Sequence, residues 1–329
     1  MSDWMIETVK LTKQFKFLVA VDSINLKIKN GDIFGFIGPN GAGKTTTIKM
    51  LATLLRPTDG DALLNGYSIR RNPKEVRELI GYSPDFFGLY EEMKVEEYLQ
   101  FFAGAYNIPK EKQKTLIDNV LELTDLSIKK KTYLKGLSRG MQQRMNIARI
   151  LLHDPKILLL DEPASGLDPR ARIELRALLK QLKKMGKTIV ISSHILTELT
   201  EICNSIGIIE KGVILYQGPI NEIMREIQRG IILNIRVKGD MSSAAMLLDK
   251  QPGVIEALIE TRENESSENS GIREGEKVEF IRLKLSEEEQ DFSKYAALLI
   301  NYGYELLQFK EEEINLEDVF LQVTKGTVA

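Results

Sequence analysis

A glycine-rich stretch, GPNGAGKTT, holds the residues with the clearest chemistry in this chain. It fits the pattern G-x-x-x-x-G-K-[ST] from Gly38 to Thr45, after an apolar run and before a helical pattern. Its glycines let backbone N–H groups turn inward around phosphates, at a helix N-terminus whose dipole favours anions. Lys44 supplies a positive charge for the β and γ phosphates, and Thr45 offers a hydroxyl to Mg²⁺. These residues predict a P-loop that binds a nucleoside triphosphate.

Two adjacent carboxylates end the apolar stretch KILLLDEP. Successive residues of a strand point in different directions, so Asp161 can hold the Mg²⁺ shell while Glu162 faces a water molecule. The P-loop upstream favours this interpretation over acids that merely leave the sheet.

A third cluster, LKGLSRGMQQRM, begins a helix at Ser138, and Gly140 lets another group approach the backbone closely. A helix N-terminus with a hydroxyl and a glycine can bind an anion, although ordinary capping also explains these residues. The position just before the acidic strand favours a second anion site.

The elements that must position these clusters alternate between strands and amphipathic helices over a first domain, residues 1–229. The runs IFGFIG, ILLLD and TIVISS are apolar without strict alternation, which predicts a sheet covered on both faces. The leucines of RIELRALLKQLKKMG repeat at helical spacing, with Gly186 placed to end the helix. Residues 88–153 show helical patterns and no convincing strand, which predicts an inserted helical subdomain.

A second domain is expected over residues 230–329, where the pattern becomes β-α-β-β-α-β. This order suits a small α+β, ferredoxin-like unit, with the polar stretch 262–276 as the loop between its middle strands. The closing stretch INLEDVFLQVT predicts a further helix.

Size and composition suit two globular domains: 329 residues, 43% apolar residues and a net charge of -2. The balance gives no strongly basic surface, so we expect no nucleic-acid partner. No apolar run is long enough to cross a bilayer, and the N-terminus lacks signal-peptide features. The single cysteine, Cys203, follows an apolar pattern that predicts a buried thiol. The chain is therefore expected in the cytoplasm, and any membrane role needs a partner.

Taken together, the motifs over residues 5–220 resemble the nucleotide-binding subunit of ATP-binding cassette (ABC) transporters. GPNGAGKTT looks like the Walker A motif, ILLLDEP the Walker B motif, SGLDP the D-loop, and LSRGM the LSGGQ signature, from which Arg139 and Met141 depart. His194 matches the switch histidine. Phe15 lies where the family stacks an aromatic ring on adenine, but Phe17 is close enough to leave the choice open, and a core phenylalanine is a further alternative.

The resemblance implies a P-loop NTPase fold with an antiparallel β subdomain, and a head-to-tail pair of chains that encloses two ATP molecules with Mg²⁺. Glu162 would be the general base or orient the water, His194 would contact the γ phosphate, and Lys44 would offset its charge. Asp168 would communicate across the dimer. The residues implied to contact ATP are Phe15, Gly38, Pro39, Asn40, Gly41, Ala42, Gly43, Lys44, Thr45 and Thr46 of one chain, with Ser138, Gly140 and Asp168 of the other.

Asp85, in IGYSPDFFGLY, stands where the family usually has a glutamine that contacts Mg²⁺ or the attacking water. An aspartate is shorter and charged, so it could join Thr45 and Asp161 as a metal ligand and sharpen metal dependence. Ser-Pro-Asp is also good turn chemistry, and the two interpretations stay open.

The resemblance further implies a transmembrane permease as partner, a homodimer or a pair with a similar cassette, and a place on the inner face of the cell membrane. One cassette with a C-terminal NLEDVFLQVT looks like subunits of ABC-2 type exporters. Two other classes are an ATP-dependent switch in translation or DNA repair and a nucleotide-binding regulator with weak turnover. The single P-loop speaks against the first, and the presence of Lys44, Glu162 and His194 speaks against the second.

Overall fold

The computed structural model describes residues 4–195, 199–222, 231–263, 277–286, 289 and 291–311. The chain divides into two compact units between Ile220 and Asn221, and each is described by itself. The predicted domain boundary after residue 229, most of the predicted loop 262–276 and the predicted C-terminal helix lie outside the described residues.

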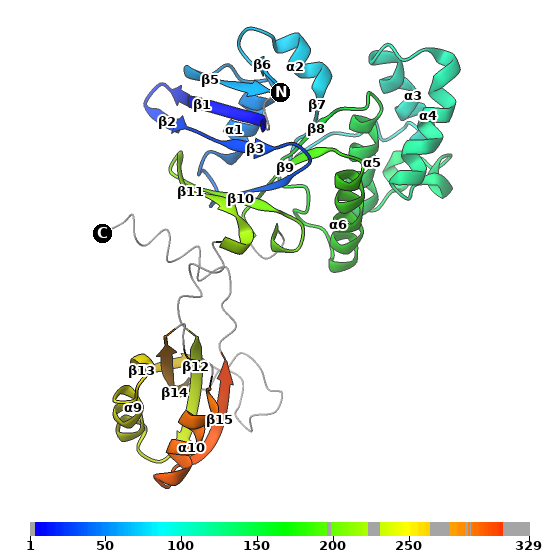
Figure 1. Cartoon of the computed structure of the whole chain (residues 1–329). Coiled ribbons are helices and arrows are strands. Elements are labelled where there is room, and N and C mark those ends of the chain that lie inside the picture. The colour runs from blue at the N-terminus through cyan, green and yellow to red at the C-terminus, as the bar shows by residue number, and fades with distance from the viewer. Residues whose placement is uncertain are drawn as a thin grey trace. The chain divides into compact units, whose positions relative to one another are not determined.

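The first unit, called the cassette below, begins with a small antiparallel sheet (Figure 1). All its strand pairs are antiparallel, and β1 lies between β2 and β5. Its strands are β1 (Trp4–Phe15), β2 (Leu18–Ile24), β3 (Lys27–Lys29), β5 (Asp59–Leu64) and β6 (Tyr67–Ser68). The expected antiparallel β subdomain is present.

The second sheet of the cassette has the order β11-β10-β4-β9-β8-β7 and is parallel from β10 to β7. Its strands are β4 (Ile33–Ile37), β7 (Ile80–Ser83), β8 (Ile157–Leu160), β9 (Thr188–Ser193), β10 (Ser205–Glu210) and β11 (Val213–Pro219). Every residue of β4, β8 and β9 is buried, so the predicted sheet covered on both faces is confirmed. The carboxyl ends of parallel strands share one edge, and this edge collects the P-loop after β4, Asp161 and Glu162 after β8, His194 after β9 and Asp85 after β7.

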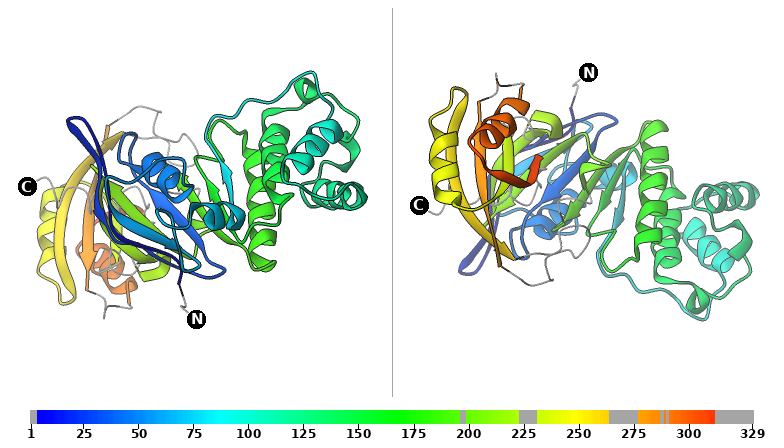
Figure 2. Two further views of the ribbon diagram at one scale, coloured as in Figure 1. Left: turned by 90° about the horizontal axis from the view of Figure 1, so that it is seen from above. Right: turned by 90° about the horizontal axis from the view of Figure 1, so that it is seen from below.

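The two helices of residues 95–123 lie at the opposite end of the cassette from β1 and β2 (Figures 1 and 2). The helices are α1 (Lys44–Leu51), α2 (Pro73–Leu79), α3 (Val95–Ala105), α4 (Lys110–Leu123), α5 (Arg139–Leu151) and α6 (Pro169–Lys184), with 3₁₀ turns at Ser127–Lys129 and Leu134–Gly136.

Helix α6 shows how the sequence pattern sets the packing. Its leucines 175, 178, 179 and 182 are all buried, as their helical spacing predicts. Asp168 caps its N-terminus, and Gly186 follows its C-terminus with a φ of 82°. Burial of this stripe fixes the helix that begins at Pro169, the last residue of the SGLDP segment.

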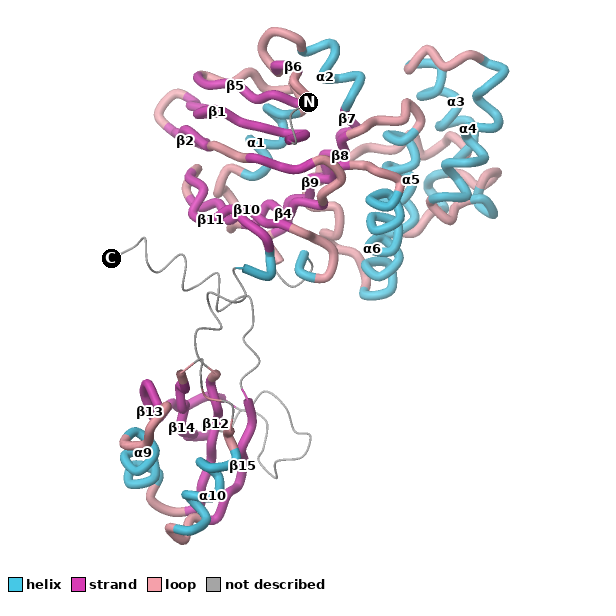
Figure 3. Tube along the Cα trace, in the orientation of Figure 1, coloured by secondary structure: helices cyan, strands magenta, loops and turns pink. Residues whose placement is uncertain are grey.

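The second unit is a four-stranded antiparallel sheet with two helices (Figure 3). Its strand order is β13-β14-β12-β15, and its elements are β12 (Ile232–Lys238), α9 (Met241–Asp249), β13 (Val254–Glu263), β14 (Lys277–Leu285), α10 (Ser293–Asn301) and β15 (Glu305–Glu311). One core cluster joins both helices to alternate residues of β12 and β14, so both helices cover the same face. The element order is the predicted one, while the ferredoxin-like classification stays a prediction.

Two further expectations concern burial. Cys203 is buried against the parallel sheet, and this burial raises the pKa of its thiol, as expected of a structural cysteine. Within the described ranges, no helix has both the length and the apolar character that crossing a bilayer requires.

Candidate functional site

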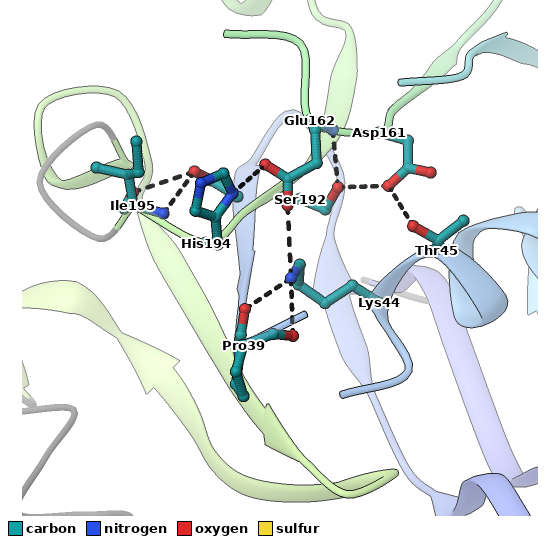
Figure 4. A network of polar contacts seen from close by, with 10 residues as sticks. Pro39, Lys44, Thr45, Asp161, Glu162, Ser192, His194 and Ile195 are labelled. Carbon is teal, nitrogen blue, oxygen red and sulfur yellow. Dashed lines mark hydrogen bonds and ion pairs between the residues drawn. The ribbon is translucent and has the colours of Figure 1, made fainter. Parts of the chain in front are cut away.

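The P-loop folds around its own lysine, Lys44 (Figure 4). Lys44 is 6% exposed, and its Nζ donates to the carbonyl oxygens of Gly38 at 2.6 Å and Pro39 at 3.2 Å. The same Nζ forms an ion pair with Glu162, whose Oε1 lies 3.4 Å away. The ammonium group is therefore held at the mouth of the loop with a carboxylate as its counter-ion.

Two glycines of the loop leave no room for a side chain. A Cβ on Gly38 would lie 2.3 Å from the carbonyl oxygen of Ile209, and one on Gly43 would lie 2.5 Å from that of Ala20. Gly43 also has a φ of 110°, a conformation that other residues rarely adopt. The loop is thus pressed against β10 and β2, which fixes where its N–H groups point.

Asp161 is the buried acid of the site, at 1% exposure (Figure 4). Its Oδ1 accepts hydrogen bonds from Thr45 Oγ1 at 3.0 Å and Ser192 Oγ at 2.7 Å. Burial raises the pKa of this carboxyl, while the two hydroxyls oppose the rise. A buried carboxylate beside a threonine hydroxyl has the hard oxygen donors that Mg²⁺ prefers, so the residues present fit this ion.

Glu162 contacts three other residues of the site, and its backbone is strained. Its φ is 47°, in the left-handed region, and its N–H donates to Ser192 Oγ at 2.9 Å. Besides the contact with Lys44, its Oε2 lies 2.8 Å from Nδ1 of His194. Because a carboxylate accepts hydrogen bonds, this contact places the proton on Nδ1 and leaves Nε2 free to meet another group.

Asp85 lies near this network and forms no hydrogen bond or ion pair with it among the described residues. Its side chain is exposed, and its negative charge contributes to the raised pKa of Asp161. The pKa of Tyr82 rises to about 12, first through burial and then through the charges of Asp161 and Asp85. These shifts place Asp85 within electrostatic reach of the buried acid, but its metal-binding role stays a prediction.

Ser138, Gly140 and Asp168 lie outside the network, at the N-termini of α5 and α6. Ser138 Oγ accepts from Met141 N at 3.4 Å, and Asp168 Oδ1 accepts from Ala171 N at 2.9 Å, so both are helix caps within this chain. A Cβ on Gly140 would lie 2.6 Å from Cβ of Ala171, so this glycine brings the two helices together.

Arg139, which replaces a glycine of the family signature, lies against the SGLDP segment. A Cβ on Gly166 would lie 2.4 Å from the guanidinium carbon of Arg139, and Gly166 has a φ of 65°. The Arg139 side chain therefore packs against Gly166, in the segment that follows Glu162.

The other predicted nucleotide contacts surround the mouth of the loop. Pro39, Asn40 and Gly41 are exposed, Thr46 is half-buried and Ala42 is buried. Phe15 is 43% exposed with Lys13 Nζ 5.0 Å from its ring centroid, and Phe17 is fully exposed. Neither phenylalanine is in the core, so that alternative is wrong, and the choice between them as the adenine contact stays open.

Sequence reasoning missed Ser192, which joins both acids and is fully buried. The paired serines that end the TIVISS run were the available signal, since a polar residue at the carboxyl end of a buried parallel strand faces the ligand edge.

These contacts define a P-loop nucleoside triphosphatase: a phosphate loop, a buried acid beside a threonine hydroxyl, and a second acid in contact with a lysine and a histidine. A model of the ABC transporter family matches residues 21–165. The chain is 34% identical to the bacitracin transport ATP-binding protein BcrA of Bacillus licheniformis, over 98% of each chain.

Solved structures agree with this match. An ATP-binding subunit of an ABC transporter is 30% identical, covering 68% of this chain and 93% of that one, with a TM-score of 0.61. A dimeric, post-hydrolysis ATP-binding cassette with ADP and Pi is 26% identical, covering 66% of this chain and 99% of that one, with a TM-score of 0.59. The chain therefore belongs to the family of ABC transporter ATP-binding proteins, and it is an ATP-binding, ATP-hydrolysing subunit.

Proposed function

We propose that two cassettes enclose ATP between them and that its hydrolysis powers an ABC-2 type exporter. The observation that carries this proposal is the placement of Glu162 between Lys44 and His194, directly beside the Asp161–Thr45 pair. A carboxylate in this setting can orient or deprotonate a water molecule, and the surrounding charges are fixed before substrate arrives.

Each group of the network has a separate task. A triphosphate that enters the loop competes with Glu162 for Lys44, so binding frees that carboxylate to meet water. Asp161 and Thr45 would hold Mg²⁺, which when bound supplies positive charge to the phosphate oxygens. His194, oriented by Glu162 through Nδ1, would present Nε2 to the γ phosphate. Asp85 would add a further carboxylate to the metal shell.

The site of one chain is completed by its mate in this proposal. Ser138 and Asp168 are exposed and make no contact with Lys44, Asp161 or Glu162 among the described residues. A helix N-terminus with an exposed hydroxyl is suited to a phosphate, and a similar solved cassette is a dimer, which supports this proposal. The mate is a second copy of this chain or a similar cassette.

The membrane partner is proposed from relatives. BcrA is named as a bacitracin transport protein and matches this chain from end to end, including the second unit. We infer that a transmembrane permease binds the cassette on the inner face of the membrane and selects the exported substance.

The test is retention of ATP by a Glu162→Gln variant. The amide keeps the size of the side chain but cannot act as a base, so the variant should keep Mg-ATP through a desalting column while the parent releases its products. A Lys44→Ala control should retain none.

A second substitution tests the shared site. Glu162→Gln combined with Ser138→Glu places a negative charge at the proposed phosphate contact of the mate and should abolish retention, although the P-loop is unchanged. Full retention by the double variant would contradict the enclosed pair.

A further inference from the structure

A buried polar pair lies between helix α5 and strand β7. Asn146 and Ser83 are both fully buried, and Nδ2 of Asn146 donates to Oγ of Ser83 at 2.6 Å. The residues on either side of Asn146 in the helix, Met145 and Ile147, are buried and apolar. Two apolar side chains of the same shape would be about as stable here as a buried hydrogen bond, so packing alone does not require this pair.

The helix lies directly on the backbone of the strand beside this pair. A Cβ on Gly81 would lie 3.2 Å from Cβ of Ile150, one turn of α5 after Asn146. Gly81 and Ser83 are two residues apart in β7, so both face the helix. Of these two contacts, the Asn146–Ser83 bond lies nearer the carboxyl end of the strand, where the acids of the site are.

Ser83 connects the helix to these acids. Its hydroxyl oxygen accepts from Asn146, and its carbonyl oxygen accepts the N–H of Asp161 at 2.9 Å. Asp85 follows two residues later, after the end of β7. One residue thus meets α5 with its side chain and holds Asp161 with its backbone.

The second polar atom of the Asn146 side chain indicates that stability is not the purpose of the pair. Oδ1 is buried and has no hydrogen-bond partner among the described residues. A buried acceptor without a partner costs stability. Exchange of the two amide atoms would leave Nδ2 without a partner instead, because a serine hydroxyl can donate as well as accept. In either orientation the amide makes the bond to Ser83, and a leucine of similar shape would avoid the cost.

We propose that Asn146 is a positioning residue for the metal: through Ser83 it fixes Asp161 and the segment of Asp85 against α5. This inference rests on the proposed role of the two acids in holding Mg²⁺. A hydrogen bond has a defined length and direction, whereas apolar contact is non-directional. An apolar pair would therefore pack as well but allow the end of β7 to shift along the helix, and the metal ligands would lose their fixed placement.

The test is a paired substitution, Ser83→Ala with Asn146→Leu, which replaces both polar groups by apolar ones of similar shape. The melting temperature of the nucleotide-free full chain measures stability. Titration with a non-hydrolysable ATP analogue, in Mg²⁺ and in EDTA, measures the metal ratio, defined as the dissociation constant in EDTA divided by that in Mg²⁺. Ser83→Ala alone leaves the buried amide without its partner, so it should lower both the melting temperature and the metal ratio.

The paired variant should separate the two readouts. Its melting temperature should lie within about 2 °C of the parent, because no buried polar group is left unpaired. Its metal ratio should stay about tenfold below that of the parent, a loss typical of groups that support a metal ligand. A purely structural pair predicts recovery of both readouts, so a paired variant with the metal ratio of the parent would overturn the proposal. An unchanged metal ratio in Ser83→Ala would also overturn it, whether or not the paired variant folds.

Thr8→Val is the matched control for loss of stability. Thr8 is buried in β1, in the antiparallel sheet, where its hydroxyl donates to the carbonyl of Ile24 at 2.9 Å and accepts from Leu26 N at 2.7 Å. Valine keeps the shape and removes both bonds, so the melting temperature should fall while the metal ratio stays at the parent value. An equal loss of metal ratio in this control would show that destabilisation alone lowers it, which would overturn the inference.

Addition of Ser138→Glu to the parent and to each variant separates this inference from the pairing of cassettes. The Asn146–Ser83 bond lies within one chain, so the tenfold difference should persist in this background. Its disappearance there would mean that the metal ratio depends on pairing, and the positioning role would be wrong. ATP retention by Glu162→Gln, by contrast, reports on the pairing and not on Asn146.

Discussion

Ser192 offers a sharp test of how the two acids are held. Its Oγ donates to Asp161 at 2.7 Å and accepts from the N–H of Glu162 at 2.9 Å, in a fully buried position. Ser192→Ala removes a hydrogen bond to a charged group, worth about 1.5–3 kcal/mol, and leaves a buried N–H unpaired at about 1–3 kcal/mol. Because the two losses overlap at one atom, we expect about 3 kcal/mol in total.

Calorimetry of the nucleotide-free protein measures this loss. For a cassette of this size 1 kcal/mol corresponds to about 2–4 °C, so the melting temperature of the cassette should fall by roughly 6–12 °C. Hydrolysis should fall as well, since the strained backbone of Glu162 loses its acceptor. Ser127→Ala, an exposed serine in a 3₁₀ turn, is the control and should shift it by less than about 2 °C. A shift for Ser192→Ala as small as that of the control would refute the reasoning.

Two further predictions concern carboxylates at the site. The folded-state pKa of Asp161 is raised above 3.8, so ionisation of this carboxyl lowers the free energy of unfolding as the pH rises above that value. In EDTA and without nucleotide, Asp161→Asn should therefore have a higher denaturant midpoint than the parent protein at pH 7. This difference should shrink toward pH 4. An equal gain at both pH values would show that charge is not the cause. Asp85→Gln should keep ATP binding and change the rate of hydrolysis by a modest factor. Asp85→Ala should uncouple hydrolysis from transport in vesicles that contain the permease. Unchanged coupled transport in the alanine variant would show that Asp85 has no role in the mechanism.

The parts of the fold that follow from local pattern could be predicted from the sequence. The continuous apolar runs that became β4, β8 and β9 indicate strands buried on both faces, and the leucine stripe of α6 repeats with the period of a helix. The P-loop was predictable for a similar reason, because its glycines and Lys44 act within a few residues of one another.

Contacts between distant segments were not predictable in the same way. Ser192 is 31 residues from Asp161 and meets it only because β8 and β9 are neighbours in the sheet. The left-handed backbone of Glu162 depends equally on packing that no local pattern states. The place of Asp85 beside Asp161 arises from the pairing of β7 with β8.

The close approach of Gly140 to Ala171 has a mechanical consequence. The methyl group of Ala171 lies directly against the backbone of Gly140, so the first turns of α5 and α6 cannot come closer together. Arg139 against Gly166 adds a second point of contact, so the two helix starts cannot slide independently. A tilt of α5 toward α6 would therefore push against the beginning of α6, which links the two surfaces proposed to meet a second cassette.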